Sequence, residues 1–333
     1  MSDTRPLRSS LGWFPGVLLS LAAVYFLSRF INLDELIKAF KTLTIADLGI
    51  MLVLLLLSLC ARANGWRHLL EEVPFKQAFL VVNEGYLFNN LIPRSGEIVR
   101  TLLISGTARI SAFQVASSVL VERALDVLIA ASMFLITLPF AIELTWIKPI
   151  AWVLFSICIV LLFVLVILAI KSERVKIWMD SLHFKSTLLR TRIIPKIGLI
   201  LDGLAVLKQP LKFGRALFWI LISWTCWTSL VYFGMTRLSA FVPIWWAIFA
   251  QGVLALGIAL PSAPAGLGVY EGTMVAAFSV FGFSESGALS IALTLHVMQI
   301  VVTTIIGIYG LMVQGQSMTA LIQRIRLRKP DQT

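Results

Sequence analysis

Charged residues are scarce in this chain, and so are the residues of most metal and catalytic sites. Only 14% of its 333 residues are Asp, Glu, Lys or Arg, and it has three histidines. Its cysteines, Cys60, Cys158 and Cys226, stand singly in apolar stretches without CxxC or metal spacing, so we expect no metal and no disulfide framework. The P-loop, HExxH, GxSxG and DxD patterns are missing too. We therefore expect no cofactor, and these absences lower the odds of an enzyme without removing acid/base chemistry by buried carboxylates.

Apolar residues are abundant instead. They make up 59% of the chain, and the mean hydropathy is +0.91, far outside the soluble range. Apolar runs of about 17 to 25 residues predict membrane-spanning helices, since only helices satisfy their own backbone in lipid. The predicted fold is all-α, a polytopic membrane helix bundle of about eight transmembrane helices plus a broken helical hairpin. The predicted spans are 11–31, 46–62, 112–141, 149–170, 216–236, 242–260, 268–283 and 286–313.

The broken hairpin is predicted at residues 76–108, an apolar region interrupted by polar residues. Two half-helices that meet inside the membrane and return to the same side fit the loop charges. The alternative is that residues 76–92 cross fully while another element is re-entrant. With the hairpin entering from the cytoplasm and all later spans crossing, the two halves of the chain would run parallel.

The formal net charge of +11 comes from Lys and Arg that gather between apolar runs, which argues against nucleic-acid binding and for the positive-inside rule. We expect one membrane domain over 1–333, with a first half at 1–170 and a second half at 216–315. The basic connector at 171–215, the tail at 316–333 and the N-terminus should face the cytoplasm. The connector fits either amphipathic helices on an anionic leaflet or a solvated loop.

The first interruption reads "NNLIPRSGEIVR". Pro93 suits the first turn of a helix, where its missing N–H costs nothing. A half-helix starting there would present free N–H groups and a positive dipole end inside the membrane, to which Arg94 and Arg100 add full charges. This pattern predicts an anion site. Its candidate residues are Asn89, Asn90, Pro93, Arg94, Gly96, Glu97 and Arg100.

The second interruption, "ALPSAPAGLGVYEG", repeats the order Pro, Gly, Glu. We expect a tight turn followed by a helix that begins near residue 267 or 269. Paired Pro/Gly breaks point to a transporter's binding site, although small residues in membrane helices also serve packing. The candidate residues here are Pro264, Gly266, Gly268, Tyr270 and Glu271.

A third motif, "VERALDV", places three charged residues deep in an apolar run. Glu122 and Asp126 share one helix face, and Arg123 lies three residues from Asp126. Charges at this depth must face the bundle interior or water. They form either a structural ion-pair knot or the polar wall of a substrate path. A lone membrane histidine such as His296 is more often an interhelical hydrogen-bond partner than a proton relay.

Taken as an ordered trio, these motifs resemble the lysylphosphatidylglycerol synthase transmembrane family, also called flippase-like. The family's first motif falls on Asn89, Pro93, Gly96, Glu97 and Arg100, its second on Glu122, Arg123 and Asp126, and its third on Pro264, Gly266, Gly268, Glu271 and Gly272. The resemblance implies a bacterial-type inner-membrane protein related to the module that moves aminoacylated phosphatidylglycerol between leaflets. We expect the membrane module without the synthase's soluble aminoacyl-transferase domain.

The expected function is that of a lipid flippase that moves an anionic phospholipid or lipid-linked phosphate between leaflets. Two alternatives remain, a membrane transferase or hydrolase acting on a lipid phosphate, and a non-transporting accessory of a lipid-biosynthesis complex. The expected partners are a membrane phospholipid or lipid-linked phosphate, with a second copy of the chain or a lipid-biosynthesis enzyme as further possibilities.

Overall fold

The structure is a computed structural model that describes residues 32–70, 73–107, 110–141, 209–260 and 262–318, together with isolated positions elsewhere. Across these residues the chain forms nine α-helices, one short 3₁₀ helix and no strand. The all-α prediction is therefore confirmed. The predicted spans 11–31 and 149–170, most of the basic connector and most of the tail lie outside the described residues.

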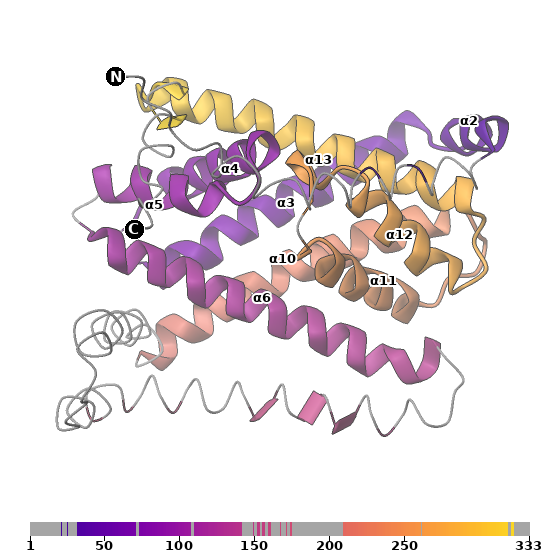
Figure 1. Cartoon of the computed structure of the whole chain (residues 1–333), viewed down its shortest axis with the longest axis horizontal. Coiled ribbons are helices and arrows are strands. Elements are labelled where there is room, and N and C mark those ends of the chain that lie inside the picture. The colour runs from indigo at the N-terminus through magenta and orange to yellow at the C-terminus, as the bar shows by residue number, and fades with distance from the viewer. Residues whose placement is uncertain are drawn as a thin grey trace, which may run out of the picture.

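The elements follow one another as α2, α3, α4, α5, α6, α10, α11, η5, α12 and α13 (Figure 1). Their bounds are Leu33–Lys41, Ile45–Leu69, Phe75–Leu91, Gly96–Thr107, Ala112–Ala141, Pro210–Thr236, Ile244–Gly257, Pro264–Gly266, Val269–Ser279 and Glu285–Val313.

Within the described part of the chain, four helices are long and apolar enough to cross a membrane: α3, α6, α10 and α13. Each has 25 to 30 residues, about 38 to 45 Å at 1.5 Å per residue, which exceeds the roughly 30 Å of a bilayer's apolar core. Local signals fix their ends. Thr44 and Asp47 form a capping box at the start of α3, and Pro210 occupies the first turn of α10. The chain is a multi-pass membrane protein.

The remaining apolar helices are short and pair into two hairpins. Helices α4 and α5 flank the first interruption, as predicted, and α11 and α12 flank the second. Helices α5, α11 and α12 have 12, 14 and 11 residues, about 17 to 21 Å, too short to span. The sequence overestimates the lengths at 242–260 and 268–283, because α11 already ends at Gly257 and α12 ends at Ser279, before the left-handed Gly282.

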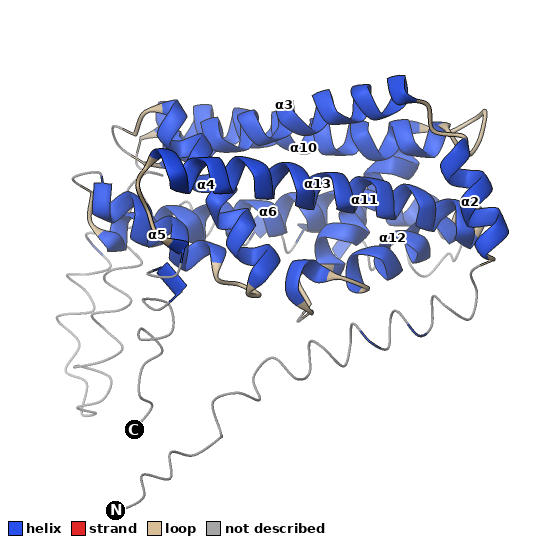
Figure 2. Ribbon diagram, turned by 90° about the horizontal axis from the view of Figure 1, so that it is seen from above, coloured by secondary structure: helices blue, strands red, loops and turns tan. Residues whose placement is uncertain are grey.

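The two hairpins enter the bundle from opposite ends. Helices α3 and α10 are antiparallel, since Asp47 pairs with Arg237 at one end while Gly65 packs on Ile220 toward the other. Helix α4 starts beyond the carboxyl end of α3, and α11 starts beyond that of α10. The hairpin tips meet in the middle, where α4 packs against η5 (Figures 1 and 2).

The order long helix, two half-helices, long helix thus occurs twice, as α3 to α6 and as α10 to α13. Equivalent helices also pack on equivalent partners, α4 on α13 and α11 on α6. The predicted parallel relation of the halves is wrong: they are inverted. It assumed that 242–260 and 268–283 cross fully, whereas two half-helices place their junction in the middle of the bundle. Inverted repeats of this kind are common in membrane transporters.

Candidate functional site

The first hairpin turns at Ile92 to Ser95, and α5 begins at Gly96. Pro93 therefore lies in the turn and not in the first turn of the helix, a correction to the prediction. Asn89 replaces it as the organiser, because its Oδ1 accepts the Gly96 N–H at 2.7 Å across the turn. The Asn89 side chain, from α4, thus caps α5. It accepts a hydrogen bond from one of the N–H groups that were expected to be free for an anion.

Arg94 links the two hairpin tips. Its backbone is left-handed, with φ 60°, and its exposed guanidinium donates to the carbonyl oxygen of Ala259 at 3.0 Å. Asn90 donates to Thr303 of α13 at 3.3 Å. Glu97 lies half-buried in the first turn of α5, and among the described residues no hydrogen bond or ion pair involves its carboxylate. The residues of the first motif are therefore near one another but face different neighbours.

Arg100, the last residue of that motif, joins the third motif in an ion network that we call the arginine cluster. It consists of Arg62, Arg100, Glu122, Arg123 and Asp126, from α3, α5 and α6. Glu122 is fully buried at its centre and accepts from Arg100, from Arg62 at 3.3 Å and from Arg123 at 3.2 Å. Asp126 pairs with Arg62 at 2.7 Å and Arg123 at 3.4 Å.

Two tryptophans hold this network in place. The Arg100 guanidinium lies 4.0 Å from the centre of the Trp66 ring, and the Trp66 indole donates to Ser118 at 3.1 Å. The Trp224 indole donates to Asp126 at 3.0 Å. Four helices therefore converge on the cluster, which fixes the directions of its charges before any ligand arrives.

The arginine cluster carries one more positive than negative charge. Three arginines face two carboxylates, and Arg123 is the most accessible of the five, with 42% of its side chain exposed. It lies 11 residues into α6, about 16 Å along that helix. An arginine whose side chain is partly exposed at this depth can bind a phosphate or carboxylate through its guanidinium N–H groups.

The second hairpin tip is built differently. Pro264 opens η5, Ala265 is left-handed at φ 59°, and Gly266 and Gly268 have φ 79° and 80°. Helix α12 starts at Val269, with Tyr270 and Glu271 in its first turn, as predicted. One oxygen of Glu271 accepts the Gly268 N–H at 2.7 Å. The amino end of α12 is thus capped by its own carboxylate, contrary to the expectation that it is free to bind an anion.

The other oxygen of Glu271 contacts His296 Nδ1 of α13 at 2.6 Å. His296 Nε2 lies 2.9 Å from the Ala265 carbonyl oxygen, and the Tyr270 ring stacks on the imidazole with 4.1 Å between centroids. We call Ala265, Tyr270, Glu271 and His296 the histidine cluster. Its Glu271–His296 pair joins α12 to α13, as Arg100–Glu122 joins α5 to α6 in the inverted half.

Sequence reasoning missed two polar positions. Arg62 was taken as the end of the span 46–62, but α3 continues to Leu69 and carries Arg62 inside the bundle. The apolar residues after it were the available signal. Glu84, in the middle of α4, is fully buried and accepts from Gln314 at 2.8 Å. A glutamate inside the apolar run 76–92 was a signal of a buried polar contact.

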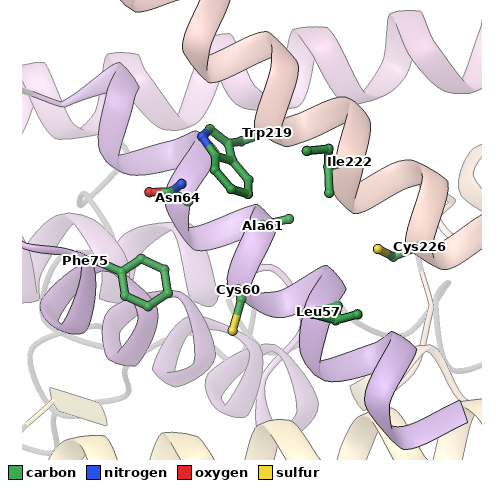
Figure 3. Close-up of a pocket in the computed structure, with 8 residues that line it drawn as sticks. All are labelled: Leu57, Cys60, Ala61, Asn64, Phe75, Trp219, Ile222 and Cys226. Carbon is green, nitrogen blue, oxygen red and sulfur yellow. The ribbon is translucent and has the colours of Figure 1, made fainter. Parts of the chain in front are cut away.

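A groove of about 380 Å³ lies between α3 and α10 (Figure 3). Cys60 and Asn64 line it from α3, and Trp219, Ile222 and Cys226 line it from α10. On a helix, residues 60 and 64 lie about 160° around the axis from Arg62. The groove is therefore on the opposite side of α3 from the arginine cluster, and its apolar lining does not fit a charged headgroup.

The comparison with protein families agrees with this architecture. No curated protein matches the chain significantly. A sequence model of the lysylphosphatidylglycerol synthase TM region matches residues 13–307, which include both hairpins and both polar clusters. Since that match covers most of the chain and the membrane architecture accompanies it, the protein belongs to the lysylphosphatidylglycerol synthase transmembrane-region family.

Proposed function

We propose that the protein moves an anionic phospholipid, or a lipid-linked phosphate, between the two leaflets of a membrane. The observation that carries this proposal is the arginine cluster, a preorganised network with one excess positive charge and a half-exposed arginine deep in the bundle. Placing three arginines deep in a membrane protein is costly, and such charges usually mark a functional path.

The phosphate would bind Arg123, and the network would rearrange around it. Arg123 already shares Glu122 with Arg62 and Arg100, so an incoming phosphate can replace carboxylate oxygens at Arg123 without leaving Glu122 unpaired. The lipid's acyl chains would remain in the bilayer. The half-exposed side of Arg123 is the entry point for the headgroup.

The inverted hairpins supply the movement. Their tips meet in the middle of the bundle and are joined by the Arg94–Ala259 hydrogen bond on an exposed surface. In the proposed cycle, one hairpin moves against the rest of the bundle to open the cluster to one leaflet, and the other opens it to the second leaflet. Alternating access around a fixed midplane site is the usual use of inverted repeats.

We further propose a bacterial-type inner membrane, with the N-terminus, the connector and the tail in the cytoplasm. The basic residues between 171 and 215 and near the C-terminus support this orientation. A transporter is favoured over a lipid-phosphate transferase or hydrolase because Glu122 and Asp126 are both engaged by arginines. A general acid or base needs a carboxylate within reach of substrate protons.

The test is leaflet exchange in vesicles of phosphatidylglycerol and phosphatidylethanolamine containing the purified full-length chain. Fluorescent phosphatidylglycerol in the outer leaflet is bleached by dithionite, and the protected fraction reports exchange. We expect exchange in the wild type and strong loss in Arg123→Gln. The matched control is Arg237→Gln, which removes a similarly exposed arginine, at 38%. Among the described residues its partners are Asp47, in an ion pair, and Phe233, in a cation–π contact, both outside the cluster.

Exchange that is equal in wild type and Arg123→Gln would remove the arginine cluster from the mechanism. Lipid analysis of the same vesicles by mass spectrometry separates the enzyme alternative, which requires a changed lipid. If the vesicles show neither lipid exchange nor a chemically changed lipid, the transport proposal is overturned and the accessory role remains. Lipids that co-purify with the protein would identify the headgroup.

A further inference from the structure

The histidine cluster contains a hydrogen-bonding constraint that the arginine cluster does not. The Ala265 carbonyl oxygen can only accept, so its contact at 2.9 Å requires a proton on His296 Nε2. The contact of His296 Nδ1 with Glu271 Oε1 is 2.6 Å long and also needs a proton between its two atoms. A neutral imidazole that carries its hydrogen on Nε2 has none on Nδ1. Nδ1 and the oxygen of an ionised Glu271 would then both be acceptors, with no hydrogen between them.

We propose that the Glu271–His296 contact is a proton-binding site, and that its bound proton holds the tip of the second hairpin in the position seen here. With the proton, the pair is an imidazolium, with hydrogen on both ring nitrogens, and a carboxylate that accepts from Nδ1. On release to water, the proton leaves a carboxylate and an imidazole with hydrogen only on Nε2. The two atoms must then separate.

The separation would act directly on the hairpin tip. Glu271 also caps Gly268, and His296 also holds the Ala265 carbonyl, so both partners of the pair are bonded to residues 265–268. Ala265 has φ 59°, a left-handed conformation that is strained for alanine and that surrounding contacts must maintain. The same tip packs on α4, the first half-helix of the other hairpin.

Few other ionisable groups face this pair. Tyr270 stacks on the imidazole, and α11 and η5 contain no titratable residue. Tyr86 of α4 and Tyr232 of α10 belong to the same apolar core, and Glu84 of α4 is bonded to Gln314. Arg94 is the charged group at the facing tip, and it binds Ala259. The proton is thus the variable charge within the cluster.

This inference deepens the proposed function, on which its transport consequence rests: opening of the second hairpin would be linked to a proton gradient. The site itself does not depend on transport. Glu271→Gln provides a sharp variant, because a glutamine amide can donate to His296 Nδ1 while its carbonyl accepts from Gly268. It keeps both contacts with a neutral imidazole, so the hairpin tip no longer needs a bound proton.

The first experiment is nitrogen-15 NMR of histidine in the full-length protein in nanodiscs. His68→Gln and His183→Gln together leave His296 as the one histidine. We expect both ring nitrogens to be protonated while the pair holds its proton, and Nδ1 alone to lose its proton as the pH is raised. A Nδ1 signal that does not change with pH, or a neutral ring protonated on Nδ1, would overturn the proposal.

The second experiment is hydrogen–deuterium exchange of residues 262–268, with labelling times corrected for the intrinsic effect of pH. Wild-type protection should fall about tenfold or more as the proton leaves, the effect of losing a charge-assisted hydrogen bond. Glu271→Gln should stay protected throughout. Glu285→Gln, which removes an exposed carboxylate at the start of the same α13, should behave as wild type. Equal pH dependence in Glu271→Gln and wild type would contradict the assignment.

Vesicles that enclose a pH-sensitive dye then connect the site to transport. Lipid exchange should be accompanied by proton movement in the wild type and not in Glu271→Gln. Lipid exchange whose rate does not depend on the pH gradient would contradict the coupling to protons and leave the proposed function intact. If the protein exchanges no lipid at all, the proposed function is wrong. The NMR and hydrogen–deuterium exchange experiments would still decide whether the proton site exists.

Discussion

The two hairpin junctions share an architecture and differ in charge. Around the first, three arginines and two carboxylates from three helices form a network with a net positive charge. Around the second, one carboxylate, one histidine and a backbone carbonyl form a network that we propose binds a proton. The difference teaches that inverted halves with one architecture can carry different polar groups, and it supports the proposal that one half binds an anion while the other binds a proton.

Among these variants, the largest loss of stability is expected for Glu122→Gln, at the first junction. Glu122 is fully buried and contacts all three arginines of the cluster. Its loss leaves the buried Arg100 without a carboxylate partner among the described residues, while Arg62 and Arg123 keep Asp126. Breaking a buried pair costs about 3–5 kcal/mol. We expect a large fall in thermal stability, measured by fluorescence-detected gel filtration after heating.

The double variant Arg100→Gln with Glu122→Gln gives the control for that expectation. It removes both charges of one pair, so its loss of stability should be smaller than the sum of the two single losses. Additive losses would show that the two side chains act independently and that the cluster is not one network.

The next effect comes from Gly96→Ala. A Cβ at residue 96 would overlap the Gly85 carbonyl oxygen and the Asn89 amide, so α4 and α5 would have to move apart. Overpacking of this kind costs about 1–3 kcal/mol. Gly49→Ala is the control, because nothing lies within 4 Å of the added atom, and there we expect no loss in the same stability measurement.

Gly266→Ala sharpens the comparison, because the second tip needs glycine for a different reason. The nearest atom to a Cβ there is Ser262 Oγ at 3.9 Å, so space is available, but φ is 79°. The expected cost is about 1–2 kcal/mol from backbone strain alone. The control Ala265→Gly should be neutral or stabilising, since φ is 59° there. A loss in Ala265→Gly would show that strain does not govern the tip.

The smallest effect is expected for Arg94→Ala. Its hydrogen bond to Ala259 is exposed, so the loss should be about 1 kcal/mol or less. The more informative measurement is hydrogen exchange at both tips, which should rise together if this bond joins them. A rise at the first tip alone would argue that the hairpins move independently.

The sequence predicted much of this arrangement because its signals were local. Length and hydropathy fixed the long helices, and the paired Pro and Gly residues marked both interruptions. The predicted half-helices at 76–108 are α4 and α5. Pro93 was misplaced because its fixed φ suits both a turn and a first helical turn, and the Asn89–Gly96 hydrogen bond that decides between them spans the turn.

The sequence by itself determined that the chain is a helical membrane protein, where its apolar runs are interrupted and that Glu122, Arg123 and Asp126 lie deep within one of them, because these follow from composition, proline and glycine positions and helix periodicity. Only the tertiary structure decided that the halves are inverted, that Arg62 and Arg100 meet Glu122 and that His296 binds Glu271. Those partners lie 22 to 60 residues apart, and the direction in which each helix packs, rather than any local preference, brings them together.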